Sequence, residues 1–86
     1  MNSYSAEYYQ KLEALLLKSL EEANEHFDEN DREDHEDYNI VKEYIGHNEF
    51  GLAWEELLCI FVSKKLNIPE SMRISGKIMG LQIDLE

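Results

Sequence analysis

The pattern of apolar residues is clearest between Phe50 and Leu66, in the stretch FGLAWEELLCIFVSKKL. Steps of three and four residues from Trp54 lead to apolar residues at 57, 58, 61 and 62, which is the periodicity of an α-helix. The apolar arc is wider than about 100°, and a helix with so broad an arc is expected to be covered on more than one side. This stretch therefore predicts a central helix over about 49–66, with the rest of the chain packed around it.

Three further segments have the same periodicity. A single apolar stripe predicts a helix over about 5–27, and a shorter pattern predicts another over about 37–47. Gly46 is expected to end that helix in a left-handed conformation, and Asn48 is a candidate cap for the next one. The last helix is expected over about 69–80, since Pro69 suits a first helical turn. Residues 28–36 are predicted to form a polar loop.

These elements predict an all-α fold, a small antiparallel bundle of about four helices in a single domain over residues 1–86. The only cysteine, Cys59, lies inside the apolar central helix and is predicted to be a buried, unreactive core residue. It has no second cysteine with which to form a disulfide inside the chain. No secretion signal or long uncharged apolar run is present, so we expect a cytoplasmic protein with no membrane association.

The charge balance narrows the choice of partner. Nineteen acidic residues against eight Lys and Arg give a net charge of −11. Nucleic acids and anionic membranes are therefore excluded as ligands, because both are bound through clustered Lys and Arg. No arrangement of histidine with cysteine or carboxylates predicts catalysis, and no cofactor is expected. The negative charge can then interact with a basic protein, with a cation or with water alone.

Most of the excess negative charge comes from one stretch, Glu21–Asp37, in which ten residues are acidic and only Arg32 is basic. Such a run can simply be a solvated surface that keeps a small protein soluble. It can also be a surface complementary to a basic partner, because neutralising crowded like charges removes their mutual repulsion. Phe27 lies within this stretch and Tyr38 directly follows it, and aromatic side chains beside a charged surface are suitable anchors. The predicted partner-binding residues are Glu22, Glu25, Asp28, Glu29, Asp31, Glu33, Asp34, Glu36, Asp37 and Tyr38.

The same stretch has some features of a calcium loop. Oxygen-bearing side chains alternate through DENDREDHEDYN at positions 28–39. However, the sixth position is Glu33 where the turn needs glycine, and the twelfth is Asn39 in place of a bidentate glutamate. No metal site is therefore predicted. A small cation-binding protein that uses His26, His35 and the carboxylates between them is the weakest alternative.

Between Val41 and Leu81 a short helix ends at HNE, a longer helix opens with FGLA, and the dipeptide IP precedes a closing amphipathic segment that ends in MGL. This half of the chain resembles the small all-helical immunity proteins of bacterial contact-dependent growth-inhibition and polymorphic-toxin systems. The resemblance implies a protein without catalytic activity. It implies that the protein binds a cognate toxin domain, often a nuclease, in the cytoplasm of the producing cell.

The resemblance and the charge lead to one hypothesis. A nuclease, whether it cleaves RNA or DNA, needs a basic cleft to hold phosphates, and an acidic surface can occupy that cleft in place of the nucleic acid. We therefore expect an immunity protein that occludes the basic substrate cleft of its toxin. The alternative is an acidic adaptor or regulatory protein that binds some other basic protein.

Overall fold

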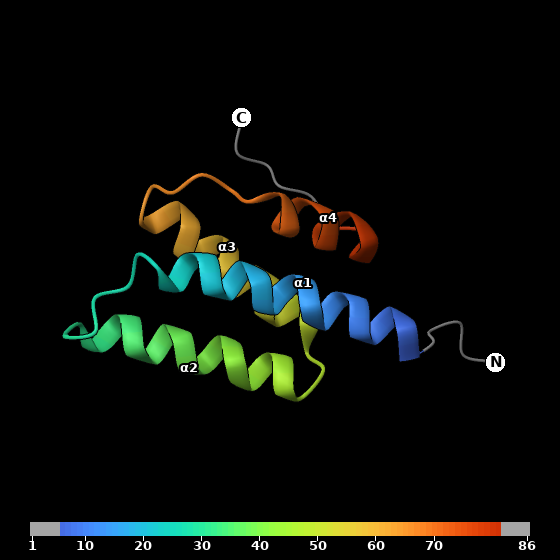
Figure 1. Ribbon diagram of the computed structural model, residues 1–86, viewed down its shortest axis with the longest axis horizontal. Coiled ribbons are helices and arrows are strands. Elements are labelled where there is room, and N and C mark those ends of the chain that lie inside the picture. The colour runs from blue at the N-terminus through green and yellow to red at the C-terminus, as the bar shows by residue number, and fades with distance from the viewer. Residues whose placement is uncertain (1–5, 82–86) are drawn as a thin grey trace.

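The computed structural model describes residues 6–81, which form a bundle of four helices. The helices are α1 (Ala6–Asn24), α2 (Arg32–Gly46), α3 (Phe50–Ser63) and α4 (Glu70–Met79). Successive helices run in opposite directions, and α1 crosses in front of α3 with α2 and α4 on either side (Figure 1). In the described part of the chain α1 and α3 each pack against the other three helices, whereas α2 and α4 do not touch. The predicted all-α bundle is confirmed.

The core is built from apolar side chains of all four helices. Its buried members are Leu12, Leu16, Leu20, Ala23, Val41, Ile45, Phe50, Ala53, Trp54, Leu57, Ile60, Phe61 and Met72. Polar groups within it have partners, as burial requires. The indole Nε1–H of Trp54 donates to the carbonyl oxygen of Met72 at 2.8 Å, and the hydroxyls of Ser19 and Ser71 lie 2.6 Å apart. These two bonds attach α4 to α3 and α1.

The outer face of α3 differs from the prediction. Leu52 is 47% exposed and Val62 is 46% exposed, and the thiol of Cys59 is exposed as well. These positions lie on one stripe of the helix, turned away from its three neighbours. The prediction that Cys59 is a buried core residue is therefore wrong, although α3 is covered on more than one side, as expected. An apolar residue at helical spacing does not reveal which side of the helix lacks a neighbour.

The largest boundary error concerns α2, which begins at Arg32 and not near residue 37. Asp31 caps the helix: its side chain accepts hydrogen bonds from the backbone N–H groups of Glu33 at 2.9 Å and Asp34 at 3.4 Å. Carboxylates are also favoured in a first helical turn by the helix dipole. The predicted loop over residues 28–36 is thus wrong in its second half, because the acidic residues there start a helix.

Unlike the start of α2, the other helix ends that the structure describes fall inside the predicted ranges. The first helix ends at Asn24 and not at about 27, because its last turn has no basic residue to offset the negative end of its dipole. The prediction for α4 is confirmed, with Gly80 left-handed at φ 77°. The predicted first residue of the first helix lies outside the described residues, as do 82–86. No helix in the described chain has the length and apolar character needed to cross a membrane.

The connection between α2 and α3 corrects two predictions. Asn48, and not Gly46, takes the left-handed conformation, with φ 60°, which asparagine tolerates better than most residues. The backbone N–H of Glu49 then donates to the carbonyl oxygen of Tyr44 at 2.8 Å. Asn48 therefore belongs to the end of α2 and does not cap α3. The end of α3 repeats this arrangement, with Lys65 left-handed at φ 59°, so α3 stops at Ser63 and not at about 66.

Candidate functional site

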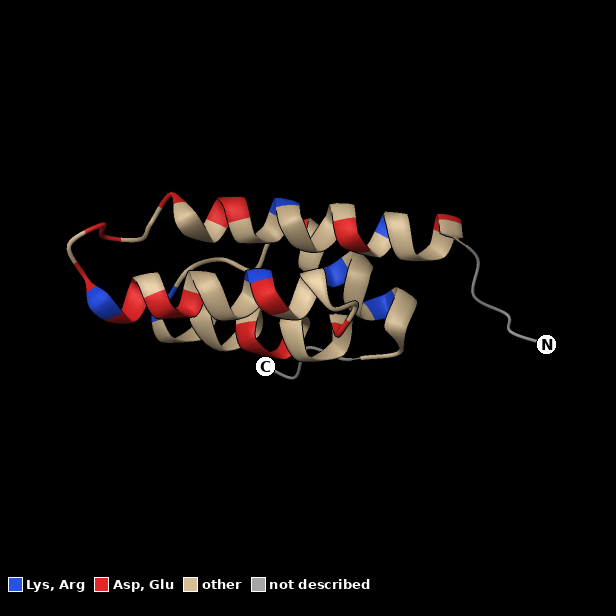
Figure 2. Ribbon diagram, turned by 90° about the horizontal axis from the view of Figure 1, so that it is seen from below, with Lys and Arg blue, Asp and Glu red and all other residues tan. Residues whose placement is uncertain are grey.

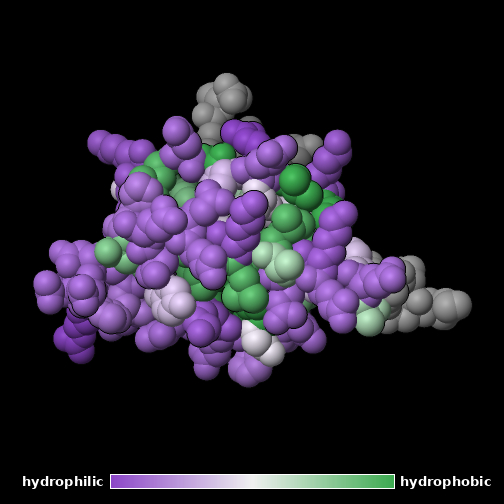
Figure 3. Space-filling model, in the orientation of Figure 1, coloured by the Kyte–Doolittle hydropathy of each residue, from purple (hydrophilic) through white to green (hydrophobic). Residues whose placement is uncertain are grey.

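The acidic stretch forms one end of the bundle, which we call the acidic end and define as residues 21–37. It consists of the last turn of α1, the connection to α2 and the first turns of α2. Figure 2 shows the acidic residues crowded along this connection, with most Lys and Arg elsewhere on the helices. In Figure 3 the same end is covered by hydrophilic side chains, and the hydrophobic ones appear mainly near the middle of the visible face.

The ten residues predicted to bind a partner share this end but differ in exposure. Six are exposed, namely Glu25, Asp28, Glu29, Asp31, Glu33 and Glu36. Glu22, Asp37 and Tyr38 are half-buried. Asp34 is only 6% exposed. The structure thus brings nine of the ten to the accessible surface and turns one carboxylate inward.

Asp34 holds three segments together. Its Oδ2 accepts a hydrogen bond from the backbone N–H of Asp28 at 2.8 Å, and Lys64 Nζ lies 3.0 Å from its Oδ1. The bond from Asp28 lowers the pKa of Asp34, and the Lys64 ammonium lowers it further. The connection, α2 and the end of α3 are thereby joined through a single side chain. Because Lys64 neutralises this charge within the chain, Asp34 contributes little to the external field.

Two more aspartates shape the connection. Asp28 Oδ1 accepts from the backbone N–H of Asn30 at 2.9 Å, and Asp31 caps α2 as described above. The glutamates of the acidic end are used differently. In the described part of the chain no hydrogen bond or ion pair holds the side chains of Glu25, Glu29 or Glu33. Asp28, Asp31 and Asp34 thus order the backbone, whereas Glu25, Glu29 and Glu33 supply negative charge that the chain itself leaves unneutralised. Glu36 differs, since its Oε2 lies 3.6 Å from Nε of Arg32.

Asp37 lies one turn after Asp34 on α2 and is half-buried. Desolvation raises its pKa, and the negative charge of Asp34 raises it further. The folded state therefore holds the Asp37 proton more tightly than the unfolded chain does. Folding therefore disfavours the ionised form of Asp37.

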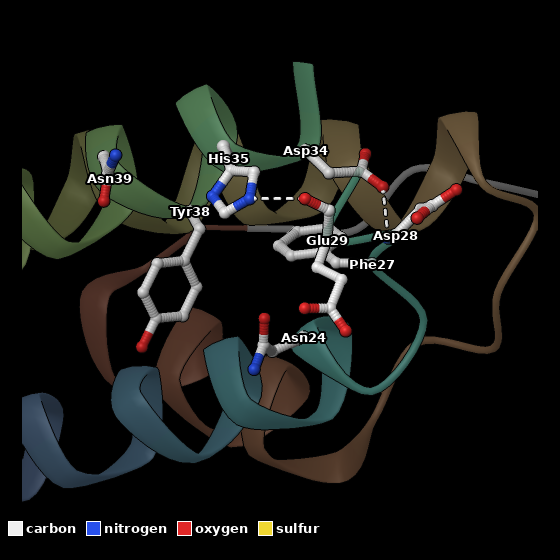
Figure 4. A pocket seen from close by; sticks show the side chains of 8 residues that line it. All are labelled: Asn24, Phe27, Asp28, Glu29, Asp34, His35, Tyr38 and Asn39. Atoms are coloured by element: carbon white, nitrogen blue, oxygen red, sulfur yellow. Dashed lines mark hydrogen bonds between the residues drawn. The ribbon is translucent and has the colours of Figure 1, made fainter. Parts of the chain in front are cut away.

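A pocket of about 510 Å³ opens between the end of α1 and the first turns of α2. Its lining is polar apart from two aromatic rings, and it consists of Asn24, Phe27, Asp28, Glu29, Asp34, His35, Tyr38 and Asn39 (Figure 4). His35 Nε2 lies 2.8 Å from the carbonyl oxygen of Glu29, which fixes the upper edge of the pocket. Phe27 and Tyr38 were predicted as anchors, but nothing in the sequence indicated that Asn24 and Asn39 line the same pocket.

The two histidines of the cation-binding alternative line different pockets. His35 belongs to the pocket just described, whereas His26 lines a second one of about 330 Å³ beside Phe61 and Lys65. Among residues 6–81 no group of three His, Cys, Asp or Glu side chains is arranged to hold a metal ion. The alternative thus has no site in the described chain.

Comparison of the chain with protein-family models, with curated proteins and with solved structures finds no match.

Proposed function

We propose that this chain is an immunity protein that binds a cognate toxin domain, a nuclease, and neutralises it in the cytoplasm of the producing cell. The observation that carries the proposal is the concentration of charge. Ten of nineteen acidic residues belong to the acidic end, and Arg32 is the only basic residue among residues 21–37. Such a surface attracts a basic protein and raises the rate of encounter.

The arrangement of the side chains supports binding as well as attraction. Asp28, Asp31 and Asp34 already order the connection, so that little backbone entropy is lost when a partner docks. Glu25, Glu29 and Glu33 are exposed and gain side-chain partners only in a complex. A basic nuclease cleft offers the matching charge, because it is built to hold phosphates.

The charge alone supports any basic protein as the partner. The likeness of residues 41–81 to immunity proteins selects a toxin from that class. An acidic adaptor or regulatory protein is the alternative, and it differs in that no toxin should be encoded beside it.

The proposal is tested by co-expression. The full chain is produced with the C-terminal domain encoded by the reading frame immediately upstream of its gene, and the pair is purified through a tag on the chain. We expect a basic domain, a complex with one copy of each protein, and growth of cells that the domain alone kills. An upstream frame without a basic toxic domain, or a toxin that neither binds nor is inhibited, contradicts the proposal. Function as an adaptor would then be the better account.

A further inference from the structure

The pocket beside the acidic end has flat apolar walls and hydrogen-bond acceptors in the same space. The half-buried ring of Tyr38 comes from α2, and the ring of Phe27 comes from the connection. The side chain of Glu29 passes the Phe27 ring in the view of Figure 4, and its carboxylate points towards the amide of Asn24. Aromatic faces and acceptors from three separate segments thus converge on one volume of about 510 Å³.

A pocket with both aromatic walls and hydrogen-bond acceptors favours a flat cation as its ligand. Aromatic faces attract cations through their negative quadrupole, and guanidinium also stacks on them. Its N–H groups pair with a carboxylate through two parallel hydrogen bonds and reach amide oxygens with the remaining donors. An anion is disfavoured by Asp28 and Glu29, and an apolar ligand would leave the Asn24 and Asn39 amides without partners.

Two lysine ammonium groups of the chain already lie near the two aromatic rings, but they do not occupy the pocket. Lys64 Nζ lies 5.2 Å from the centroid of the Phe27 ring, and Lys42 Nζ lies 5.7 Å from that of Tyr38. Both rings thus already lie beside positive charge. Neither lysine lines the pocket, so neither covers the surface that these rings present to it.

We propose that this pocket binds the guanidinium group of an arginine, placed between Phe27 and Tyr38 and paired with the carboxylate of Glu29. The claim that this arginine belongs to a protein partner rests on the proposed function. The claim that the pocket binds a guanidinium group does not depend on that function. Arginine side chains are common among the residues that dominate protein interfaces, and a pocket for one would give the acidic end specificity in addition to attraction.

The inference is tested on the free full chain with a small probe. Arginine blocked as its N-acetyl amide is titrated at low salt while backbone and side-chain amide resonances are followed by NMR. We expect saturable shifts centred on Asn24, Phe27 and Asn39, and binding about tenfold weaker for blocked citrulline, which has the same shape without the charge. Shifts that do not saturate or that spread evenly over the acidic end overturn the inference, as does equal binding of blocked lysine.

Matched variants separate the pocket from the general charge. Glu29→Gln is expected to weaken the probe about tenfold, because it removes the paired carboxylate. Glu33→Gln removes the same charge outside the pocket and should change affinity less than twofold, since this carboxylate is exposed to water and does not touch the probe. Equal effects of the two variants contradict the inference. Both residues are exposed, so neither substitution threatens the fold.

The experiments distinguish a failure of the proposed arginine pocket from a failure of the proposed immunity function. Binding of the probe without any complex with the encoded toxin retains the pocket and rejects the immunity function. A toxin complex together with no binding of the probe rejects only the pocket.

Discussion

Two aspartates on α2, three residues apart, respond to the fold in opposite directions. Asp34 is stabilised as a carboxylate by the N–H of Asp28 and by Lys64, so its pKa is lowered. Asp37 has no such partner, and burial raises its pKa. Since a shifted pKa links stability to pH, the two residues should change stability with opposite sign.

We expect Asp37→Asn to raise the free energy of unfolding at pH 7 and Asp34→Asn to lower it. The gain from Asp37→Asn should vanish below the ordinary carboxyl pKa of about 4, where Asp37 is protonated in both states. The loss from Asp34→Asn should shrink as the pH falls from the ordinary carboxyl pKa of about 4 through the lowered pKa of Asp34. Urea denaturation followed by the fluorescence of Trp54, the only tryptophan, measures both. Changes of the same sign at pH 7 would contradict this account, and exposed Glu33→Gln is the control.

Cys59 and Asp34 are two residues whose burial could not be predicted from the local sequence pattern. Both were assigned from their neighbours in sequence, one to the core and one to the binding surface. The exposure of Cys59 depends on which side of α3 has no neighbour. The burial of Asp34 depends on Lys64, thirty positions away in the chain. Neither fact has a local signal, because both arise only when the helices are packed together.

At the scale of elements, the contact between α3 and α4 depends on a glycine. A Cβ atom added at Gly76 would lie 2.8 Å from Cζ2 of Trp54, whose ring is 2% exposed and held by its bond to the Met72 carbonyl. The ring therefore has little room to move. Alanine is the better helix former, but here its methyl group has no space.

We expect Gly76→Ala to destabilise the fold by about 1–3 kcal/mol, the usual cost of overpacking, despite its gain in helix propensity. Gly51→Ala in α3 is the matched control, since nothing lies within 4 Å of the added Cβ atom. That variant should be neutral or more stable by up to about 1 kcal/mol. Thermal denaturation compares the two. A neutral Gly76→Ala would show that α4 shifts easily against Trp54.

The four helices could be predicted because each has its own apolar periodicity. Their ends were less predictable. The predicted start of α2 is late because a run of acidic residues favours a loop when only its charge is considered. Asp31 as cap and acids in the first turn are, however, typical of a helix start. The end of α3 depends on a left-handed Lys65, a conformation that lysine seldom adopts.

At the scale of the whole molecule, charge is divided unevenly along the bundle. The sequence located the acidic end correctly, since position in the chain and position in space coincide there. It could not divide that end into aspartates that order the backbone and glutamates that face solvent. For this reason a test of binding should alter the glutamates alone, because changing Asp31 or Asp34 would also disturb the fold.

The most direct test of the central claim is the association rate with the co-purified basic domain. We compare a variant with Glu25, Glu29, Glu33 and Glu36 changed to Gln and a control with Glu7, Glu13, Glu43 and Glu55 changed to Gln. Both lose four exposed negative charges, but only the first loses them at the acidic end.

At low salt the first variant should associate at least about tenfold more slowly than the unaltered chain, and the control should stay within about threefold. The difference should narrow at high salt, where exposed charges are screened. Equal rates for the two variants would contradict the claim that the acidic end is the binding surface.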